Sequence, residues 1–234
     1  RKLYIASYFR RSNFYSICVC VAVTVMDDRS ICDSAWDYAA KCVSGEISVC
    51  QNVVMACKQA IDMKLRTDIY FDESAAARPI KFASFIKHLK GPLANTPILF
   101  EPWQMFLISQ VYGWKRQDGQ RLRRSVYIEV PRKSGKSTLC SVLSLYHLMA
   151  DGESSAEVYS AATSRDQAKI VFGDAQAMAR ASNHLSTHLA VQRNCIVFAK
   201  ANSKFEPLSA DAGSLEGRSP SFAVVDELHV HKTP

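Results

Sequence analysis

The residues with the clearest chemical potential lie in the middle of the chain, where residues 130–137 read VPRKSGKS. They match the phosphate-loop pattern G-x-x-x-x-G-K-[ST] except at its start, where Val130 replaces the first glycine. In such a loop, backbone N–H groups at a helix N-terminus cradle a phosphate. We expect Lys136 to reach the β- and γ-phosphate oxygens and Ser137 to ligate Mg²⁺. Gly135 would let the backbone approach the phosphate closely, where a Cβ would clash.

The other side chains of this segment are expected to surround the same phosphates. We place Arg132 against a phosphate and in the catalytic set, and we count Lys133, Ser134 and Thr138 among the nucleotide-binding residues. One alternative stays open at this point. A Gly-Lys-Ser tripeptide arises by chance, and it also fits a polar turn between a strand and a helix.

A pair of carboxylates near the end of the chain is the second candidate. The apolar run FAVV at 222–225 precedes Asp226 and Glu227. Such a run suits a buried parallel strand, and its carboxylates would lie at the sheet edge beside the phosphate loop. We expect Asp226 to hold Mg²⁺ and Glu227 to orient or deprotonate the attacking water. A lone Asp-Glu pair also fits a solvated strand end, but the two motifs in this order predict hydrolysis of a nucleotide.

A glutamine upstream of the loop is the third candidate. Gln104 closes the segment LFEPWQ, and its amide offers both a donor and an acceptor to the N6/N7 edge of adenine. Taken alone, Gln104 also fits an ordinary position in a helix. With this residue, the three candidates predict ATP and Mg²⁺ as the bound groups.

The elements that must position these residues follow from the hydrophobic pattern. Strands are expected at 125–130, 157–161, 195–199 and 221–226, with helices at 136–149 and 164–181. Strands that alternate with helices predict parallel sheet units covered by helices. The predicted fold class is therefore α/β, a P-loop NTPase with a mostly parallel central sheet flanked by helices and preceded by a helical N-terminal region.

The first part of the chain has a helical rhythm instead. Apolar residues recur at helical spacing over 31–64, where Ser44-Gly45 separates two helices and Ser34 is the expected cap of the first. Further helices are expected at 80–89 and 103–114, and loops at 71–79 and 117–124. We expect Trp103, Met105, Phe106, Tyr112 and Trp114 to be core residues. The predicted regions are 1–29, disordered or translated from upstream; 30–96, helical; and 97–234, a P-loop ATPase domain.

Composition sets broad limits. The 234 residues are 48% hydrophobic, which allows a sizeable core, and the formal charge of +7 favours polyanion partners without requiring them. The eight cysteines show no zinc-site spacing and indicate reduced thiols. The apolar run at 17–26 is too short to span a bilayer, and we expect Met26 to be the true start.

Four segments in order resemble the large terminase subunit of tailed double-stranded DNA bacteriophages. The resemblance runs from about Trp36 to the last residue, and a phosphate loop without its first glycine is itself usual in that family. The segments are PILFEPWQ at 97–104, YIEVPRKSGKS at 127–137, EVYSAATSRDQAKIVF at 157–172 and SLEGRSPSFAVVDELH at 214–229.

This resemblance implies a motor ATPase that moves double-stranded DNA into a procapsid. The implied partners are DNA, a portal protein, a small terminase subunit and further copies of the chain in a ring, in the cytoplasm of a bacterial host and with no membrane. By resemblance, Gln104 falls on the adenine-reading motif, and Asp226 with Glu227 on the metal and water site. The residues that fall on the phosphate loop are Arg132, Lys133, Gly135, Lys136 and Ser137. The family's C-terminal nuclease is not matched, so we expect a front fragment, from a prophage or a split reading frame, without nuclease activity.

Ring ATPases often complete a neighbour's site with an arginine. Our candidate is Arg218, with Arg165 in reserve. His229 and His231 could bind a metal, but no third ligand is visible. A basic cluster fits DNA phosphates or a solvated loop equally well; it comprises Lys115, Arg116, Arg121, Arg123 and Arg124.

Two alternative functions stay open. One is another P-loop ATPase that acts on nucleic acid, such as a helicase, which would show further arginine-bearing motifs in a second sheet domain. The other is a non-catalytic prophage remnant that only binds nucleotide or DNA. Separate measurements of ATP binding and ATP turnover would distinguish the remnant from an enzyme.

Overall fold

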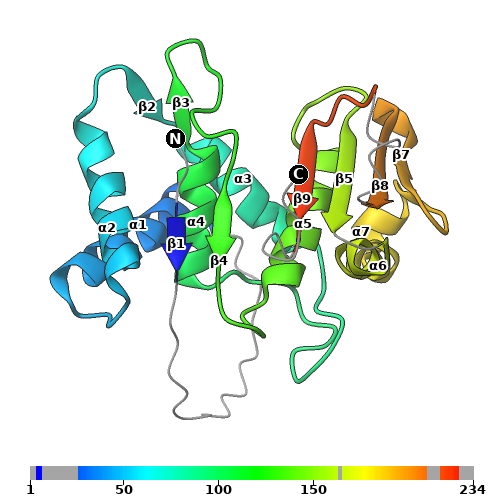
Figure 1. The fold of residues 1–234 in the computed structure, drawn as a ribbon, viewed down its shortest axis with the longest axis horizontal. Helices are drawn as coiled ribbons and strands as arrows, with labels where there is room; N and C mark the ends of the chain where they lie inside the picture. The colour runs from blue at the N-terminus through cyan, green and yellow to red at the C-terminus, as the bar shows by residue number, and fades with distance from the viewer. Residues whose placement is uncertain (1–3, 7–25, 163–164, 210–216, 227–234) are drawn as a thin grey trace. The chain divides into compact units, whose positions relative to one another are not determined.

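The computed structural model describes residues 4–6, 26–162, 165–209 and 217–226 of the chain. It forms two compact units (Figure 1), one of residues Arg1–Lys81 with Leu99–Ser134 and one of residues Phe82–Ile98 with Gly135–Pro234. The boundaries of these units differ from those of the three regions expected from sequence. The division into those regions stays a prediction. Most of the apolar run at 17–26 lies outside the described residues. No helix in the described part is long and apolar enough to cross a membrane.

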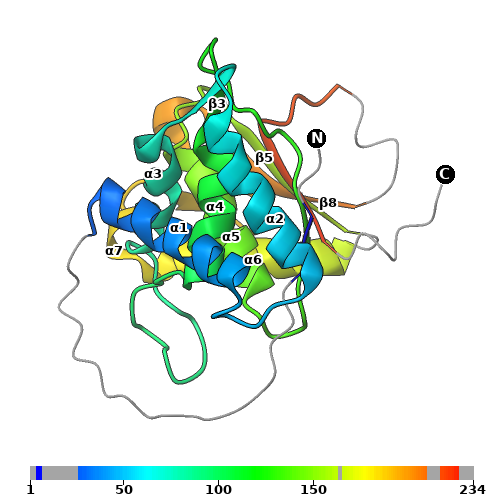
Figure 2. The same ribbon diagram turned by 90° about the vertical axis from the view of Figure 1, so that its left-hand side faces the viewer.

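The first unit is built on three helices. Helix α1 (Asp28–Ser44) contacts both α2 (Gln51–Asp62) and α4 (Pro102–Tyr112), as Figure 2 shows. Helix α1 begins where the Asp27 side chain accepts a 2.7 Å hydrogen bond from the Ser30 N–H, a standard N-cap contact. The expectation that Ser34 is the cap is therefore wrong. The predicted break between the helices is confirmed, because Gly45 ends α1 with a left-handed φ of 84°.

Aromatic rings form the core of this unit beside a short hairpin. Strands β2 (Ile69–Phe71) and β3 (Trp114–Arg116) pair antiparallel and bring Phe71 opposite Trp114. The ring centroids of Trp36 and Trp114 each lie 5.2 Å from that of Phe71. Of the core residues expected from sequence, Phe106, Tyr112 and Trp114 are buried, whereas Trp103 and Met105 are half-buried.

Residues 71–79 were expected to be a loop, and this is wrong. Helix α3 spans Glu73–Ala83, so the helix expected at 80–89 begins earlier and ends earlier. The Asp72 side chain accepts from the Ala75 N–H at 2.9 Å and starts the helix. The three alanines that follow favour helix more than any other residue type, and they outweigh Pro79, the signal that suggested a loop.

The strand that precedes the candidate loop also belongs to the first unit. Strand β4 (Tyr127–Glu129) pairs in parallel with β1 (Tyr4–Ala6), and the two arrows lie side by side in Figure 1. Together they form a two-stranded sheet. Strand β4 was expected in the same sheet as the later strands, so that part of the prediction is wrong for the described structure. Strand β1 falls inside the segment that we expected to be disordered or translated from upstream.

The second unit contains a mixed five-stranded sheet in the order β6-β7-β8-β5-β9. Only β8 (Ser203–Ser209), β5 (Glu157–Ala162) and β9 (Phe222–Val225) run parallel. Strands β6 (Ala190–Val191) and β7 (Ile196–Phe198) are antiparallel to their neighbours. The mostly parallel sheet predicted from sequence is corrected to a mixed sheet. The connections explain the difference, because the short turns between β6, β7 and β8 can join antiparallel strands only.

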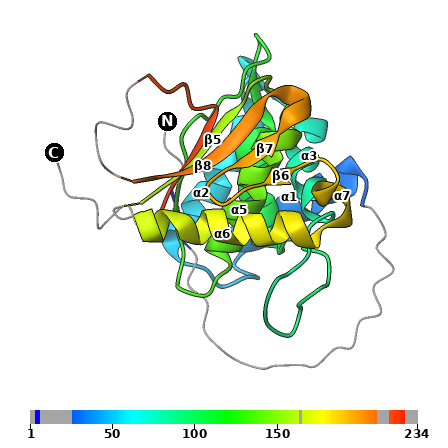
Figure 3. The ribbon, with the colours of Figure 1, turned by 90° about the vertical axis from the view of Figure 1, so that its right-hand side faces the viewer.

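Two helices of this unit pack on the sheet and on each other. Helices α5 (Lys136–Met149) and α6 (Arg165–Ala181) both contact β5 and β8, and α6 runs beside the strands in Figure 3, with the short α7 (Asn183–Ser186) after it. Two buried hydroxyls tie α6 down. Ser141 Oγ of α5 donates to the Val171 carbonyl at 2.9 Å, and Ser160 Oγ of β5 donates to the Ala168 carbonyl at 3.0 Å. The Ser141 hydroxyl also lies 2.8 Å from the Ser137 carbonyl of its own helix and shares its hydrogen between the two carbonyls. Both buried hydroxyls thus have hydrogen-bond partners.

The tight packing at Gly113 can be tested by adding a methyl group. A Cβ at Gly113 would lie 2.4 Å from a Phe71 ring carbon, so Gly113→Ala should destabilise the first unit by about 1–3 kcal/mol. Urea unfolding followed by tryptophan fluorescence measures the change, since Trp36 and Trp114 lie in that unit. Gly173→Ala is the control, because nothing lies within 4 Å of a Cβ there; its unfolding is followed by circular dichroism, since the three tryptophans all lie in the first unit. It should be neutral or stabilise α6 by up to about 1 kcal/mol. Equal effects of both variants would contradict the packing described.

Candidate active site

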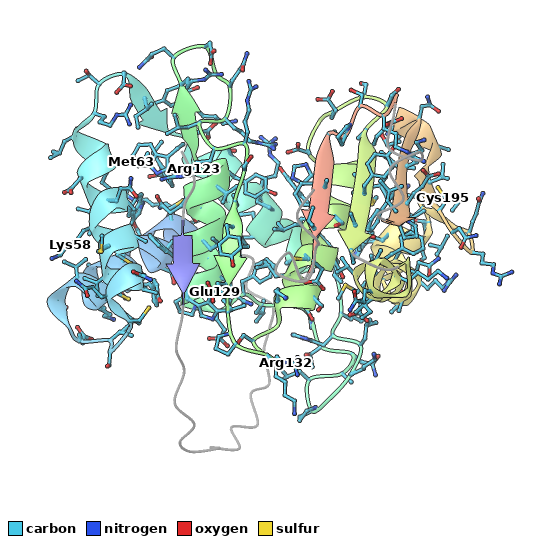
Figure 4. The ribbon with its side chains drawn as sticks, in the orientation of Figure 1. Lys58, Met63, Arg123, Glu129, Arg132 and Cys195 are labelled. Atoms are coloured by element: carbon cyan, nitrogen blue, oxygen red, sulfur yellow. The ribbon has the colours of Figure 1, made fainter. Side chains whose placement is uncertain are left out.

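The loop after β4 exposes its basic side chains. Pro131, Arg132 and Lys133 are exposed, and the Ser134 N–H donates to the Pro131 carbonyl at 3.3 Å to close a turn. Figure 4 shows Arg132 at this turn, beyond Glu129 of β4. Lys133 has a left-handed φ of 68°, which is uncommon for a residue with a side chain. The turn therefore offers two cations to solvent at a strained backbone position.

Gly135 begins helix α5 in a way that leaves its N-terminus available to an anion. Its φ of 79° is left-handed, a conformation that glycine adopts readily. Its carbonyl accepts from the Leu139 N–H at 2.9 Å, which is the start of the helical hydrogen-bond pattern. No side chain caps α5, so the positive end of the helix dipole and the N–H groups of the first turn point beyond the helix.

Two opposite charges meet at this helix end. Lys136 Nζ lies 3.0 Å from Asp226 Oδ1, and the two side chains are 32% and 16% exposed. Asp226 follows β9 directly, and its N–H donates to the Ala161 carbonyl of β5 at 3.0 Å, which extends the strand pairing. The parallel pairing of β9 with β5 therefore delivers the carboxylate to the N-terminus of α5. The Asp226 carboxylate therefore lies at the carboxyl-terminal edge of the parallel strands, where the sequence predicted it.

A thiol that the sequence did not single out lies in the field of this ion pair. Cys140 is one turn after Lys136 in α5. Burial, together with the Asp226 carboxylate, raises the pKa of the Cys140 thiol to about 12, and the Lys136 ammonium opposes the shift. The thiol is therefore protonated at neutral pH. Its spacing in the sequence carried no signal, because it matched no metal or redox motif.

Gln104 is engaged by its own helix. It is buried in α4, and its Oε1 accepts from the Glu101 N–H at 2.9 Å. In return, the Glu101 side chain accepts from the backbone N–H of Gln104, the third residue of the helix, so the two residues form a capping box. The amide oxygen of Gln104 is thus occupied within the first unit. The local signal for this role was present in the sequence, since Glu101 precedes Pro102 at the start of a predicted helix.

Arg218 also has partners in its own chain. Its guanidinium donates to Glu206 Oε2 at 3.1 Å and lies over the Tyr159 ring, 5.1 Å from the centroid. Hydrogen bonding to Tyr159 and Glu206 raises the pKa of Arg218. Strands β5 and β8 thus hold this arginine on one face of the sheet. The side chain of the reserve candidate, Arg165, is outside the described residues.

Comparison with known proteins decides the family. The sequence profile of the terminase large subunit ATPase domain matches residues 102–234, more than half of the chain. The chain belongs to the terminase large subunit family.

Two related proteins support this membership. The large terminase subunit of Enterobacteria phage HK97 is 28% identical over 141 residues, which cover 59% of this chain and 27% of that protein. The crystal structure of the HK97 bacteriophage large terminase matches with a TM-score of 0.55 and 26% identity, over 64% of this chain and 30% of that one. The chain thus spans less than a third of the length of the relatives that it matches.

Within this terminase segment, some predicted residues are not described. Glu227, His229 and His231 lie outside the described residues. In the ranges that are described, no group of three or more His, Cys, Asp or Glu residues could hold a metal ion. The described part of the site is therefore the uncapped start of α5 together with Lys136, Ser137 and Asp226.

One member of the predicted basic cluster is structural. Arg123 is only 8% exposed, and its guanidinium donates to the Gln110 carbonyl and to Met63 Sδ. Figure 4 shows Arg123 beside Met63. Burial lowers the pKa of Arg123 to about 10. The expectation of a solvated or DNA-contacting side chain is wrong for this residue, because it fastens the loop after β3 to α4.

The rate at which Cys140 is alkylated can report the electrostatics of the ion pair. Asp226→Asn removes a nearby negative charge, so it should lower the pKa of the thiol and raise the rate of iodoacetamide labelling at pH 9 several-fold. Lys136→Ala should do the opposite. Peptide mass spectrometry measures both rates, and Cys195, which precedes β7 on the side of the sheet away from β9 in strand order, is the internal control. A change of the same sign in both variants would show that the thiol does not sense the pair.

Proposed function

We propose that this chain is the ATPase part of a DNA-packaging terminase large subunit, which hydrolyses ATP to translocate double-stranded DNA into a procapsid. The observation that carries the proposal is the contact of Lys136 with Asp226 at the uncapped N-terminus of α5, inside the region that matches the terminase ATPase domain. A strand-to-helix turn that ends in Gly-Lys-Ser and lies beside a carboxylate is suited to a metal-bound triphosphate. The family match does not favour a helicase.

The residues present fit ATP with Mg²⁺. The N–H groups of the first turn of α5 would bind phosphate oxygens, and the Lys136 ammonium would neutralise the β- and γ-phosphates. Ser137 and Asp226 offer the hydroxyl and carboxylate oxygens that Mg²⁺ prefers. When bound, Mg²⁺ would offset negative charge on the phosphates. The Asp226 carboxylate already contacts the Lys136 ammonium, so both side chains reach the N-terminal end of α5.

Further loop residues have assigned roles in the proposal. Arg132, Lys133, Ser134 and Thr138 would complete the phosphate site, with Arg132 stabilising the transferring phosphoryl group. Glu227 would orient the attacking water and accept its proton.

Two more distant residues have roles that their present contacts constrain. Because the Oε1 of Gln104 is occupied by the capping box, we propose that Gln104 reads adenine through its Nε2, a donor to N7. Arg218 would act on a neighbouring copy, and to do so it would have to exchange its contact with Glu206.

The partners and location follow from the same proposal. They are double-stranded DNA, a portal protein, a small terminase subunit and a homo-oligomeric ring, in the cytoplasm of a bacterial host. We propose no nuclease activity for this chain, because two-metal nuclease chemistry needs several converging carboxylates and the paired carboxylates Asp226 and Glu227 are assigned to ATP.

Replacement of Lys136 tests the proposed phosphate site. Lys136→Ala should abolish steady-state ATP hydrolysis in any active protein that contains this domain, because the main cationic contact to the β- and γ-phosphates is lost. Release of inorganic phosphate is the measurement. Lys58→Ala, an exposed helical lysine labelled in Figure 4, is the control and should keep full activity. Turnover of Lys136→Ala within twofold of the parent would refute the site.

Replacement of Glu227 separates binding from chemistry. Glu227→Gln should retain ATP binding and lose turnover, because an amide has nearly the same shape as a carboxylate but accepts no proton. Binding is measured with a fluorescent ATP analogue and turnover by phosphate release. Weak nucleotide binding together with normal hydrolysis would show that the roles of Asp226 and Glu227 are wrongly divided.

A further inference from the structure

A buried histidine lies in the last turn of α5, at the opposite end from the candidate phosphate site. The side chain of His147 is 3% exposed. Its ring stacks on Phe222, the first residue of β9, with centroids 4.0 Å apart and an interplanar angle of 13°. The Tyr146 ring meets it edge-on at 5.5 Å. The stack therefore joins the C-terminal end of α5 to the beginning of β9.

A carboxylate fixes the plane of this ring. His147 Nδ1 lies 3.0 Å from Asp151 Oδ2, and because a carboxylate only accepts, the ring N–H donates in this contact. Asp151 follows the last turn of α5, its side chain 11% exposed, where a carboxylate faces the negative end of the helix dipole. The imidazole thus compensates a nearly buried carboxylate, and the carboxylate in turn orients the imidazole on Phe222.

Helix α5 and strand β9 are therefore held together at both ends. Lys136 contacts Asp226 at one end, and His147 stacks on Phe222 at the other. From the first to the second contact the helix rises about 16 Å, and the strand extends about 13 Å. The two elements are similar in length over this stretch and run in opposite directions. A shift or tilt of β9 along α5 would break the stack of His147 on Phe222. The same movement would displace the Asp226 carboxylate.

We propose that His147 is a positioning residue for the metal-binding half of the nucleotide site: its stack on Phe222 sets where β9 lies along α5, and so where Asp226 presents its carboxylate. The inference rests on the proposed function, since it assigns Asp226 to Mg²⁺. His147 would touch neither nucleotide nor metal. It acts through the strand.

The division of the site between two elements makes this role selective. The backbone cradle, Lys136 and Ser137 all belong to α5 and keep their mutual geometry if β9 moves. Asp226 belongs to β9. Loss of the stack should therefore weaken the contribution of Mg²⁺ to nucleotide binding and leave metal-free binding almost unchanged. Small displacements matter here, because Mg²⁺ demands near-ideal octahedral geometry.

Ordinary core packing predicts a different pattern. A histidine that only fills space would, when replaced, lower the melting temperature of the unit without separating the two binding measurements. The Phe172 and Phe205 rings provide the matched comparison, because they pack α6 on β8 with centroids 5.2 Å apart. Phe172→Leu should destabilise the same unit and leave β9 in place against α5.

The experiment measures the affinity of the full chain for a fluorescent ATP analogue, with EDTA and across a Mg²⁺ titration. His147→Leu removes the ring and its hydrogen bond, whereas His147→Phe keeps a ring on Phe222. In EDTA, we expect the affinity of His147→Leu for the ATP analogue to be within twofold of that of the parent. This variant should need a Mg²⁺ concentration at least fivefold higher than the parent for half of the maximal effect of Mg²⁺ on binding. His147→Phe should stay within threefold of the parent, and Phe172→Leu should match the parent in both measurements.

Each other outcome overturns the inference or the function on which it rests. An unchanged Mg²⁺ requirement in folded His147→Leu, or an equal loss of binding with and without Mg²⁺, refutes the positioning role. If His147→Leu does not fold, Phe222→Leu replaces it, because this variant removes the ring that β9 contributes to the stack. The same results are then expected, and the same results would refute the positioning role. A parent chain that binds no nucleotide, or binds it equally well after Lys136→Ala, refutes the proposed function instead.

Discussion

The contact of Lys136 with Asp226 is the interaction on which the candidate site depends. The two residues lie far apart in the sequence and on different kinds of element, one at the start of a helix and one at the end of a strand. Both side chains are partly removed from water, so their attraction is less screened than that of an exposed pair. In the proposed function, the lysine would bind phosphate and the carboxylate would bind Mg²⁺.

The rest of the second unit can be understood as the support for this contact. Parallel pairing with β5 sets the register of β9 within the sheet, and the Asp226 N–H continues that pairing. The buried hydroxyls of Ser141 and Ser160 tie α6 to α5 and to β5. The stack of His147 on Phe222 closes the other end of the helix–strand pair. The antiparallel strands β6 and β7 lie at the far edge of the sheet from β9 and do not contribute to its register.

Several residues with functional signatures serve their own chain first. The amide oxygen of Gln104 caps α4, Arg218 is held by Glu206, and Arg123 fastens a loop. Buried polar side chains must be satisfied in the folded protein as well as in a complex. A motif shows which groups are present, but it does not show which of their hydrogen bonds the fold has already used. The proposed roles of Gln104 and Arg218 would require these contacts to be shared or exchanged.

The sequence by itself determined the helix 136–149, the strand before Asp226, the glycine at the helix start and the family, because these are local patterns of apolar spacing and motif order. It missed α3 because local alanine propensity outweighed Pro79. It also misjudged the sheet, because strand direction and partner are set by the lengths of connections and by packing between segments distant in the chain. The contacts and burial of His147, Cys140 and Arg123 were decided only by tertiary structure, since their neighbours belong to elements that no local pattern connects.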